Sequence, residues 1–142
     1  MKELALSVKI STKKKNYLNF EALHEVSSKV ISTDAPKDNG GTGSSFSPTD
    51  LLATAYLTCA MTIIDLKAKA KGLHDIQING SIKKSMIADP QRRIGKLEVN
   101  IDLSESIATK DRAYLEAEAR ACPVALSISD AIDIDLQFSY QL

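Results

Sequence analysis

The sequence of 142 residues has no tryptophan, two cysteines and no excess of charge of either sign. Lysine plus arginine number 18 and aspartate plus glutamate also number 18, so the formal net charge is zero. Proteins that bind nucleic acid or an anionic membrane usually carry a basic excess. We therefore expect neither nucleic acid nor a membrane as a partner. A neutral chain also has little self-repulsion to oppose oligomerisation.

A signal peptide and a long apolar run are also missing. The N-terminal residues MKELALSVKIST alternate apolar and polar side chains, whereas a signal peptide needs a continuous apolar stretch. No run reaches the ~18 apolar residues that span a bilayer. We expect a cytoplasmic protein, where cysteines are normally reduced and a disulfide is more often transient and catalytic than structural.

Two cysteines are too few for several familiar sites. A structural zinc ion takes four ligands, and His24 and His74 lack ligand spacing to either cysteine. The CxxC spacing of thioredoxin-type proteins is absent. The glycine-rich segment NGGTGSS at 39–45 lacks the GK[ST] ending of a phosphate-binding loop. We therefore expect no metal and no cofactor.

The hydrophobic pattern predicts a single α+β domain over residues 1–142 with mainly antiparallel strands. A turn is expected at 13–16 and a long loop at 34–48, where glycine, serine, aspartate and proline are frequent. The expected strands are 4–10, one or two within 17–32, 75–87, 94–103 and 132–140. The expected helices are 48–71, 109–121 and a short one from Cys122 to about residue 131.

The helix at 48–71 has clear end signals. Ser47 is suited to the N-cap, Pro48 to the first helical position and Asp50 to an acidic variant of the capping box, while Gly72 fits the C-cap. Apolar side chains surround the axis of this helix, so it must be covered on every side. One chain of this length has little material for that task. The pattern therefore favours a homodimer with this helix at its centre.

Each of the two cysteines has either a purely structural role or a role in a reactive site. Cys59, in the middle of the apolar helix, is either a small core residue or half of a reactive site. Cys122 lies 63 positions later and precedes Pro123. It is therefore placed at a helix N-cap, either as a simple polar cap or as a thiol whose pKa the helix N-terminus lowers.

Two motifs resemble signatures of the OsmC/Ohr family. In SPTDLLATAYLTCAMT (47–62), Pro48 opens a long helix and Cys59 follows eleven positions later, as in the first family signature. Cys122-Pro123-Val124 resembles the second signature. The expected order of strands and helices also resembles the family over essentially the whole chain.

This resemblance implies an OsmC-like fold, with antiparallel sheets wrapped around long central helices in an intertwined homodimer. It also implies a peroxidase that reduces organic hydroperoxides in oxidative and osmotic stress defence. Cys59 would attack the peroxide and become a sulfenic acid, and Cys122 would condense with it to a disulfide. A dithiol reductant, lipoyl in the best-known members, would then restore both thiols.

The chain departs from the family pattern around the thiol. Family peroxidases hold the thiolate with an arginine from the N-terminal region, which is oriented by a glutamate directly after the helix-opening proline. Here the glutamate position is Thr49, and Asp50 comes one residue later, about 100° further around the helix. All arginines follow Cys59 in the sequence: Arg92, Arg93, Arg112 and Arg120.

These departures matter because the thiolate is the nucleophile, and apolar surroundings without a cation raise the pKa of a thiol. Thr49, Asp50 and Arg120 are the candidate supporting residues, and a lysine from 13–15 could also supply the charge. The chain resembles the broader OsmC-like branch more than a dedicated organic hydroperoxide resistance enzyme. The alternative is a non-catalytic dimer of the same fold that binds a small apolar ligand at its interface.

Overall fold

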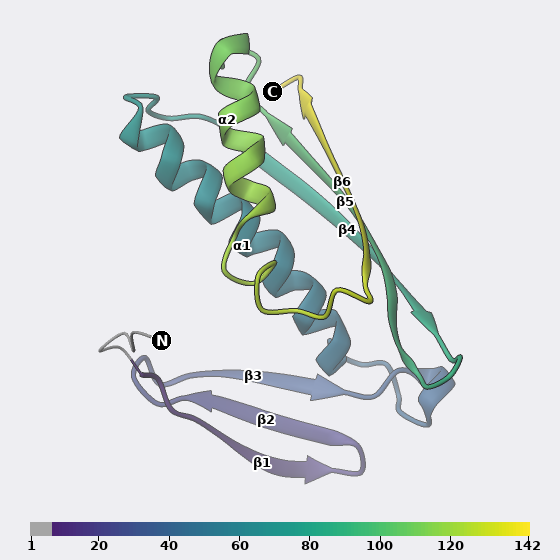
Figure 1. Ribbon diagram of the computed structural model, residues 1–142. Helices are drawn as coiled ribbons and strands as arrows, with labels where there is room; N and C mark the ends of the chain where they lie inside the picture. The colour runs from purple at the N-terminus through teal and green to yellow at the C-terminus, as the bar shows by residue number, and fades with distance from the viewer. Residues whose placement is uncertain (1–6) are drawn as a thin grey trace. The chain divides into compact units, whose positions relative to one another are not determined.

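The computed structural model describes residues 7–142, which form two compact units divided after Leu51. Most of the strand expected at 4–10 lies outside the described residues. The elements, labelled in Figure 1, are in chain order β1 (Ile10–Asn16), β2 (Asn19–His24), β3 (Lys29–Asp34), the 3-10 helix η1 (Lys37–Asn39), α1 (Pro48–Ala70), β4 (Ile78–Ile87), β5 (Arg93–Leu103), α2 (Thr109–Arg120) and β6 (Asp133–Tyr140). The α+β class predicted from the sequence is confirmed.

The first unit contains an antiparallel sheet in the order β1-β2-β3. The turn expected at 13–16 is wrong, because these residues belong to β1 and the chain reverses at Leu18, whose φ is 57°. Ion pairs between β1 and β2 explain why β1 extends through the residues expected to form the turn. Lys13 and Lys15 each place their Nζ 3.4 Å from a carboxylate oxygen of Glu21 on β2.

The loop after β3 is organised by one buried carboxylate. Asp34 is only 2% exposed. It accepts hydrogen bonds from the hydroxyl of Thr42, from the backbone N–H of Ser44 at 3.0 Å and from the Ser44 hydroxyl at 2.9 Å. The Thr42 hydrogen bond, followed by those from Ser44, lowers the pKa of Asp34 to about 2. The predicted loop is therefore an ordered segment fixed at its first residue.

Helix α1 begins with the capping box that the sequence predicts. The N–H of Ser47 donates to Asp50 Oδ2 at 2.8 Å, and the N–H of Asp50 donates to Ser47 Oγ at 3.1 Å. The helix ends at Ala70, and Gly72 follows it with a φ of 79°, which suits a residue without Cβ. There the N–H of Leu73 reaches back to the Ala68 carbonyl at 2.9 Å, which is a typical helix C-terminal hydrogen bond.

The buried positions of α1 follow a single stripe. They are Ala53, Tyr56, Ala60, Ile64 and Ala68. The opposite side is exposed at several positions in the single chain, including the apolar Leu66. Thr58 and Thr62 lie on that side and donate their hydroxyls to carbonyl groups of the same helix, each at 2.8 Å. Such local bonds let threonine occupy a helix surface without another partner.

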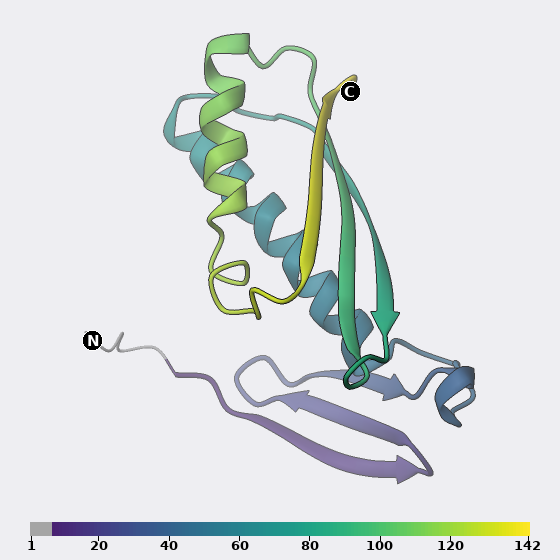
Figure 2. The same cartoon turned by 45° about the vertical axis from the view of Figure 1, so that its right-hand side comes forward.

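The second unit packs helices against one face of a sheet in the order β4-β5-β6. Strands β4 and β5 are antiparallel, whereas β5 and β6 are parallel. The parallel pair follows from the connection through α2, because two parallel neighbours need a long crossover between them. Figure 2 shows α1 and α2 on the same side of this sheet. Pairing is therefore mainly antiparallel, as expected, with β6 as the exception.

Close packing of α1 on the sheet requires a glycine in β4. A Cβ at Gly80 would lie 2.8 Å from Cδ1 of Leu57 and 2.9 Å from Sδ of Met61. By length and composition alone α1 could cross a membrane, with 23 residues and a mean hydropathy of 1.4. In this structure Ala60, Ile64 and Ala68 are fully buried in the hydrophobic core. We therefore interpret α1 as a helix of the hydrophobic core.

Candidate active site

The structure brings the two cysteines together from distant parts of the second unit. Cys59 lies in the middle of α1 and is half-buried, and Cys122 lies two residues after α2 and is fully buried. Both are free thiols, and they lie close enough for the Cys59 thiol to raise the pKa of Cys122. Two thiols that lie close together in the fold can form a disulfide if their Cα atoms come within about 7 Å, whereas two distant core thiols cannot.

The segment after Cys122 forms a series of turns, so the short helix predicted there is wrong. A helix would pair the N–H of Ser127 with the carbonyl of Pro123. Instead the Ser127 hydroxyl donates to that carbonyl at 2.7 Å, and the Ser127 N–H bonds to the Val124 carbonyl at 3.0 Å. Serine hydroxyls compete for backbone groups in this way.

Cys122 still caps the first of these turns. The N–H of Ala125 donates to Cys122 Sγ at 3.4 Å, which is the hydrogen bond of an N-cap residue. Nevertheless, burial raises the pKa of the Cys122 thiol, and contact with the Cys59 thiol raises it further. The N–H groups of Ala125 and Val124 act in the opposite direction but are outweighed. The expectation of a lowered pKa is therefore wrong, because removal from water dominates.

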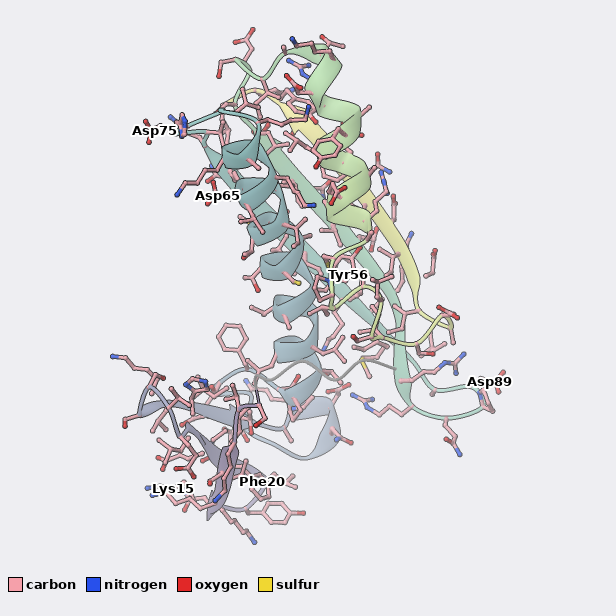
Figure 3. The ribbon with its side chains drawn as sticks, turned by 60° about the vertical axis from the view of Figure 1, so that its left-hand side comes forward. Lys15, Phe20, Tyr56, Asp65, Asp75 and Asp89 are labelled. Atoms are coloured by element: carbon pink, nitrogen blue, oxygen red, sulfur yellow. The ribbon has the colours of Figure 1, made fainter. Side chains whose placement is uncertain are left out.

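A buried tyrosine that no sequence motif marks interacts electrostatically with Cys122. Tyr56 lies on α1 three residues before Cys59 and is 2% exposed. Burial raises the pKa of its phenol, the nearby Cys122 adds to that rise, and Arg120 lowers it. Figure 3 labels Tyr56 on α1 among the side chains of the second unit. The sequence signal that could have identified Tyr56 is its spacing of three residues from Cys59, since residues three apart on a helix are neighbours.

Arg120, the candidate supporting cation, is tied to β6. Its Nη2 donates to the carbonyl of Leu136 at 3.0 Å, and its Cζ lies 5.2 Å from the centroid of the Phe138 ring. Its charge reaches Tyr56, as the pKa of that residue shows. Arg120 therefore belongs to the surroundings of the site, in contact with the strand behind it.

The other candidate supporting residues, Thr49 and Asp50, belong to the first unit and take part in the cap of α1. Thr49 Oγ1 lies 3.1 Å from the Ser47 hydroxyl, within hydrogen-bond distance. Their direct part in thiol chemistry stays a prediction. Within residues 7–142, no three His, Cys, Asp or Glu side chains gather closely enough to hold a metal ion.

Comparisons with known proteins show the family of this chain. The model of the OsmC-like protein family matches residues 41–137, a range that includes both cysteines. Organic hydroperoxide resistance protein-like 2 of Staphylococcus saprophyticus is 28% identical over 109 residues, which cover 73% of this chain and 75% of the relative.

Solved structures share the fold. One protein of Psychrobacter arcticus 273-4, provisionally named for osmotic stress induction and a detoxification response, is 35% identical with a TM-score of 0.83, covering 96% of this chain and 97% of that one. Organic hydroperoxide resistance protein OhrB of Bacillus subtilis is 17% identical with a TM-score of 0.68, covering 96% and 100%, and this likeness concerns the fold alone. Because the family model spans most of the chain, this protein belongs to the OsmC-like family, which includes organic hydroperoxide resistance proteins.

Proposed function

We propose that this protein is a thiol-dependent peroxidase that reduces organic hydroperoxides in oxidative and osmotic stress defence. The observation that carries the proposal is that two free thiols distant in sequence, Cys59 and Cys122, interact in the fold. The relative from Staphylococcus saprophyticus, named for organic hydroperoxide resistance, supports the choice of substrate class.

In the first step, the Cys59 thiolate attacks one oxygen of the hydroperoxide. The S–O bond forms as the O–O bond breaks, and the departing alkoxide takes up a proton to leave as an alcohol. Cys59 is then a sulfenic acid, the first and reversible stage of cysteine oxidation. Cys59 takes this role because it is half-buried and therefore more accessible than Cys122, which is fully buried.

In the second step, Cys122 condenses with the sulfenic acid, so a disulfide forms and water leaves. A dithiol reductant, of the lipoyl type in the family that this chain resembles, then opens the disulfide by thiol–disulfide exchange. The disulfide would thus be an intermediate of the cycle. No bound cofactor is needed for these steps, because the peroxide supplies the oxidant and the dithiol supplies the electrons.

The surroundings favour an organic hydroperoxide over hydrogen peroxide. Apolar side chains that follow Cys122, including Val124, Ala125 and Ile128, pack against the hydrophobic core. An apolar tail buried beside them would gain roughly 25 cal/mol per Å² of surface removed from water. Hydrogen peroxide has no such tail. We therefore propose that it is the poorer substrate.

The working form is proposed to be a cytoplasmic homodimer. In the single chain, Leu66 of α1 is 58% exposed although it belongs to an otherwise core-forming helix. A second copy could cover such side chains, which one chain leaves in contact with water.

The first test is oxidation of the purified protein with one equivalent of cumene hydroperoxide. We expect an internal Cys59–Cys122 disulfide, seen in the intact mass as the loss of two hydrogen atoms and located by peptide mapping. In Cys122→Ser, the same treatment should leave a sulfenic acid at Cys59 that dimedone traps. Persistence of both free thiols in the wild type would contradict the proposed cycle.

The alternative is a non-catalytic dimer that binds a small apolar ligand. It is favoured by the electrostatics of Cys122, whose pKa is set mainly by burial, the neighbouring thiol and backbone N–H groups rather than by a cation. The two functions differ in one outcome. A binding protein would hold an apolar ligand equally well with Cys59→Ser and would consume no hydroperoxide.

A further inference from the structure

Two ion pairs join the C-terminal half of α1 to α2. In the first, which we call the near pair, Lys67 Nζ lies 2.8 Å from Glu118 Oε2. In the second, the far pair, Lys71 Nζ lies 3.0 Å from Asp111 Oδ1. The lysine that comes later in the sequence thus pairs with the acid that comes earlier. The two helices therefore run in opposite directions where they meet, side by side in Figures 1 and 2.

The two ion pairs differ in their distance from the thiols. The near pair lies eight residues after Cys59 on α1 and four residues before Cys122 at the end of α2. The far pair lies twelve residues after Cys59 and eleven before Cys122. At 1.5 Å per residue, roughly 12 Å of helix separates Cys59 from the near pair. The near pair is therefore the cross-link between the helices that stands closer to both cysteines.

Hydrogen bonds connect the near pair to Cys122. The N–H of Ala121 donates to the carbonyl of Glu118 at 3.2 Å, and the N–H of Cys122 donates to the carbonyl of Ala119 at 3.2 Å. Bonds of this spacing tighten the last turn of a helix. Ala119 is itself fully buried in the core. Cys122 is thus fastened to the end of α2, and a shift of Glu118 relative to α1 is passed on to the thiol.

The far pair is at least as well supported as the near pair. The side chains of the near pair are each 33% exposed, whereas those of Lys71 and Asp111 are 38% and 14% exposed. Lys71 also lies over the ring of Tyr114, with 4.8 Å between Nζ and the ring centroid. The two ion pairs are therefore alike in chemistry and differ chiefly in their distance from the thiols.

We propose, resting on the peroxidase function above, that the near pair positions Cys122 for its reaction with oxidised Cys59, whereas the far pair only holds the helices together. A disulfide requires Cα atoms within about 7 Å, and the near pair fixes how closely the end of α2 approaches α1. In this step the S–S bond forms, the S–O bond of the sulfenic acid breaks, and the thiol proton leaves with the hydroxyl as water. Lys67 and Glu118 are positioning residues, since they act through the helices that carry the thiols.

The test compares Lys67→Met with Glu118→Gln after one equivalent of cumene hydroperoxide. Sulfenic acid should form at Cys59 at the wild-type rate in both variants. Disulfide formation, followed by mass spectrometry of quenched samples, should be about threefold slower in each, the modest effect of an ion pair that water still reaches. The double variant should be no slower than either single variant, because one substitution already breaks the pair.

Opposite charge changes separate positioning from electrostatics. Lys67→Met removes a positive charge and Glu118→Gln removes a negative one, so a direct effect of charge on the thiols would speed disulfide formation in one variant and slow it in the other. Such opposite effects would overturn the proposal. Lys67→Arg keeps the cation and should restore most of the wild-type rate.

The matched controls are Lys71→Met and Asp111→Asn, which break the far pair. Both should form the disulfide at the wild-type rate. Equal slowing in near-pair and far-pair variants would overturn the proposal, since general loosening of the two helices would then explain the result. Wild-type rates in all of these variants would overturn it as well and would leave the peroxidase cycle in place.

A second readout is the stability of the disulfide in the folded protein. In mixtures of reduced and oxidised dithiothreitol, the near-pair variants should hold a smaller share of the disulfide, with an equilibrium constant about threefold lower than that of the wild type. The far-pair variants should match the wild type, and a lowered constant in them too would contradict a specific role of the near pair. Failure of the wild type to form sulfenic acid with cumene hydroperoxide would instead overturn the cycle itself.

Discussion

Asp34 and Cys122 are both acidic side chains removed from water, yet their pKa values move in opposite directions. Hydrogen bonds from Thr42 and Ser44 lower the pKa of Asp34 to about 2. Burial raises the pKa of Cys122 although Ala125 also donates an N–H to it. The difference is chemical, since a carboxylate is a strong acceptor that several donors can satisfy at once and sulfur is a weak one.

Asp34 yields a prediction about stability and pH. Because its pKa is lower in the folded protein, its stabilising effect is complete above the ordinary aspartate pKa of about 4 and is lost as pH falls toward 2. Urea unfolding at pH 7 should therefore show Asp34→Asn to be less stable than the wild type. The difference should shrink between pH 4 and pH 2.

The control for this experiment is Asp38→Asn, which removes the same charge from η1 in the same loop. It should not reproduce the pH-dependent difference. If Asp34→Asn were as stable as the wild type at pH 7, the hydrogen bonds from Thr42 and Ser44 would not organise the loop in solution.

At the scale of elements, α2 is fastened to β6 by two arginines of the same kind. Arg112 donates to the carbonyls of Ile107 at 2.8 Å and Glu105 at 3.1 Å, and its Cζ lies 4.1 Å from the centroid of the Tyr140 ring. Arg120 repeats the pattern eight residues later, with Leu136 and Phe138. Only Arg120 lies near Cys122 in the sequence, two residues before it.

Variants of Arg112 and Arg120 can distinguish an effect on stability from an effect on the position of the thiols. Arg112→Met and Arg120→Met should each lower the free energy of unfolding by about 1–3 kcal/mol, through a lost charged hydrogen bond and a lost cation–π contact. Only Arg120→Met should also slow disulfide formation after oxidation of Cys59. A quenched time course read by mass spectrometry measures this rate. Equal rates in the two variants would show that Arg120 has no positioning role.

The sequence predicts elements well where local signals are sufficient. Ser47, Pro48 and Asp50 predict the start of α1 correctly, because a capping box involves only neighbouring residues. The parallel placement of β6 depends on how α2 crosses the sheet, which alternation of side chains does not encode. The turns after Cys122 depend on a serine hydroxyl that captures the Pro123 carbonyl. The contact between Cys59 and Cys122 followed from family resemblance, and Tyr56 emerged only with the fold.

For the whole molecule, the sheet of the first unit leaves apolar side chains in contact with water. Its register places Ile10, Phe20 and Ile31 on one face, where they are 62%, 43% and 51% exposed. Together with the exposed side chains of α1, these residues favour a homodimer, because association removes apolar surface from water. Sedimentation equilibrium at micromolar concentration should give twice the chain mass of 15.4 kDa. A stable monomer would contradict the proposed assembly.

The most direct test of the central claim is consumption of cumene hydroperoxide by the wild type and by Cys59→Ser, with dihydrolipoamide as the reductant. The account predicts repeated turnover by the wild type and none by Cys59→Ser, because the serine hydroxyl cannot replace the thiolate as nucleophile. Consumption that is unchanged in Cys59→Ser would contradict the thiol mechanism and would favour the ligand-binding alternative.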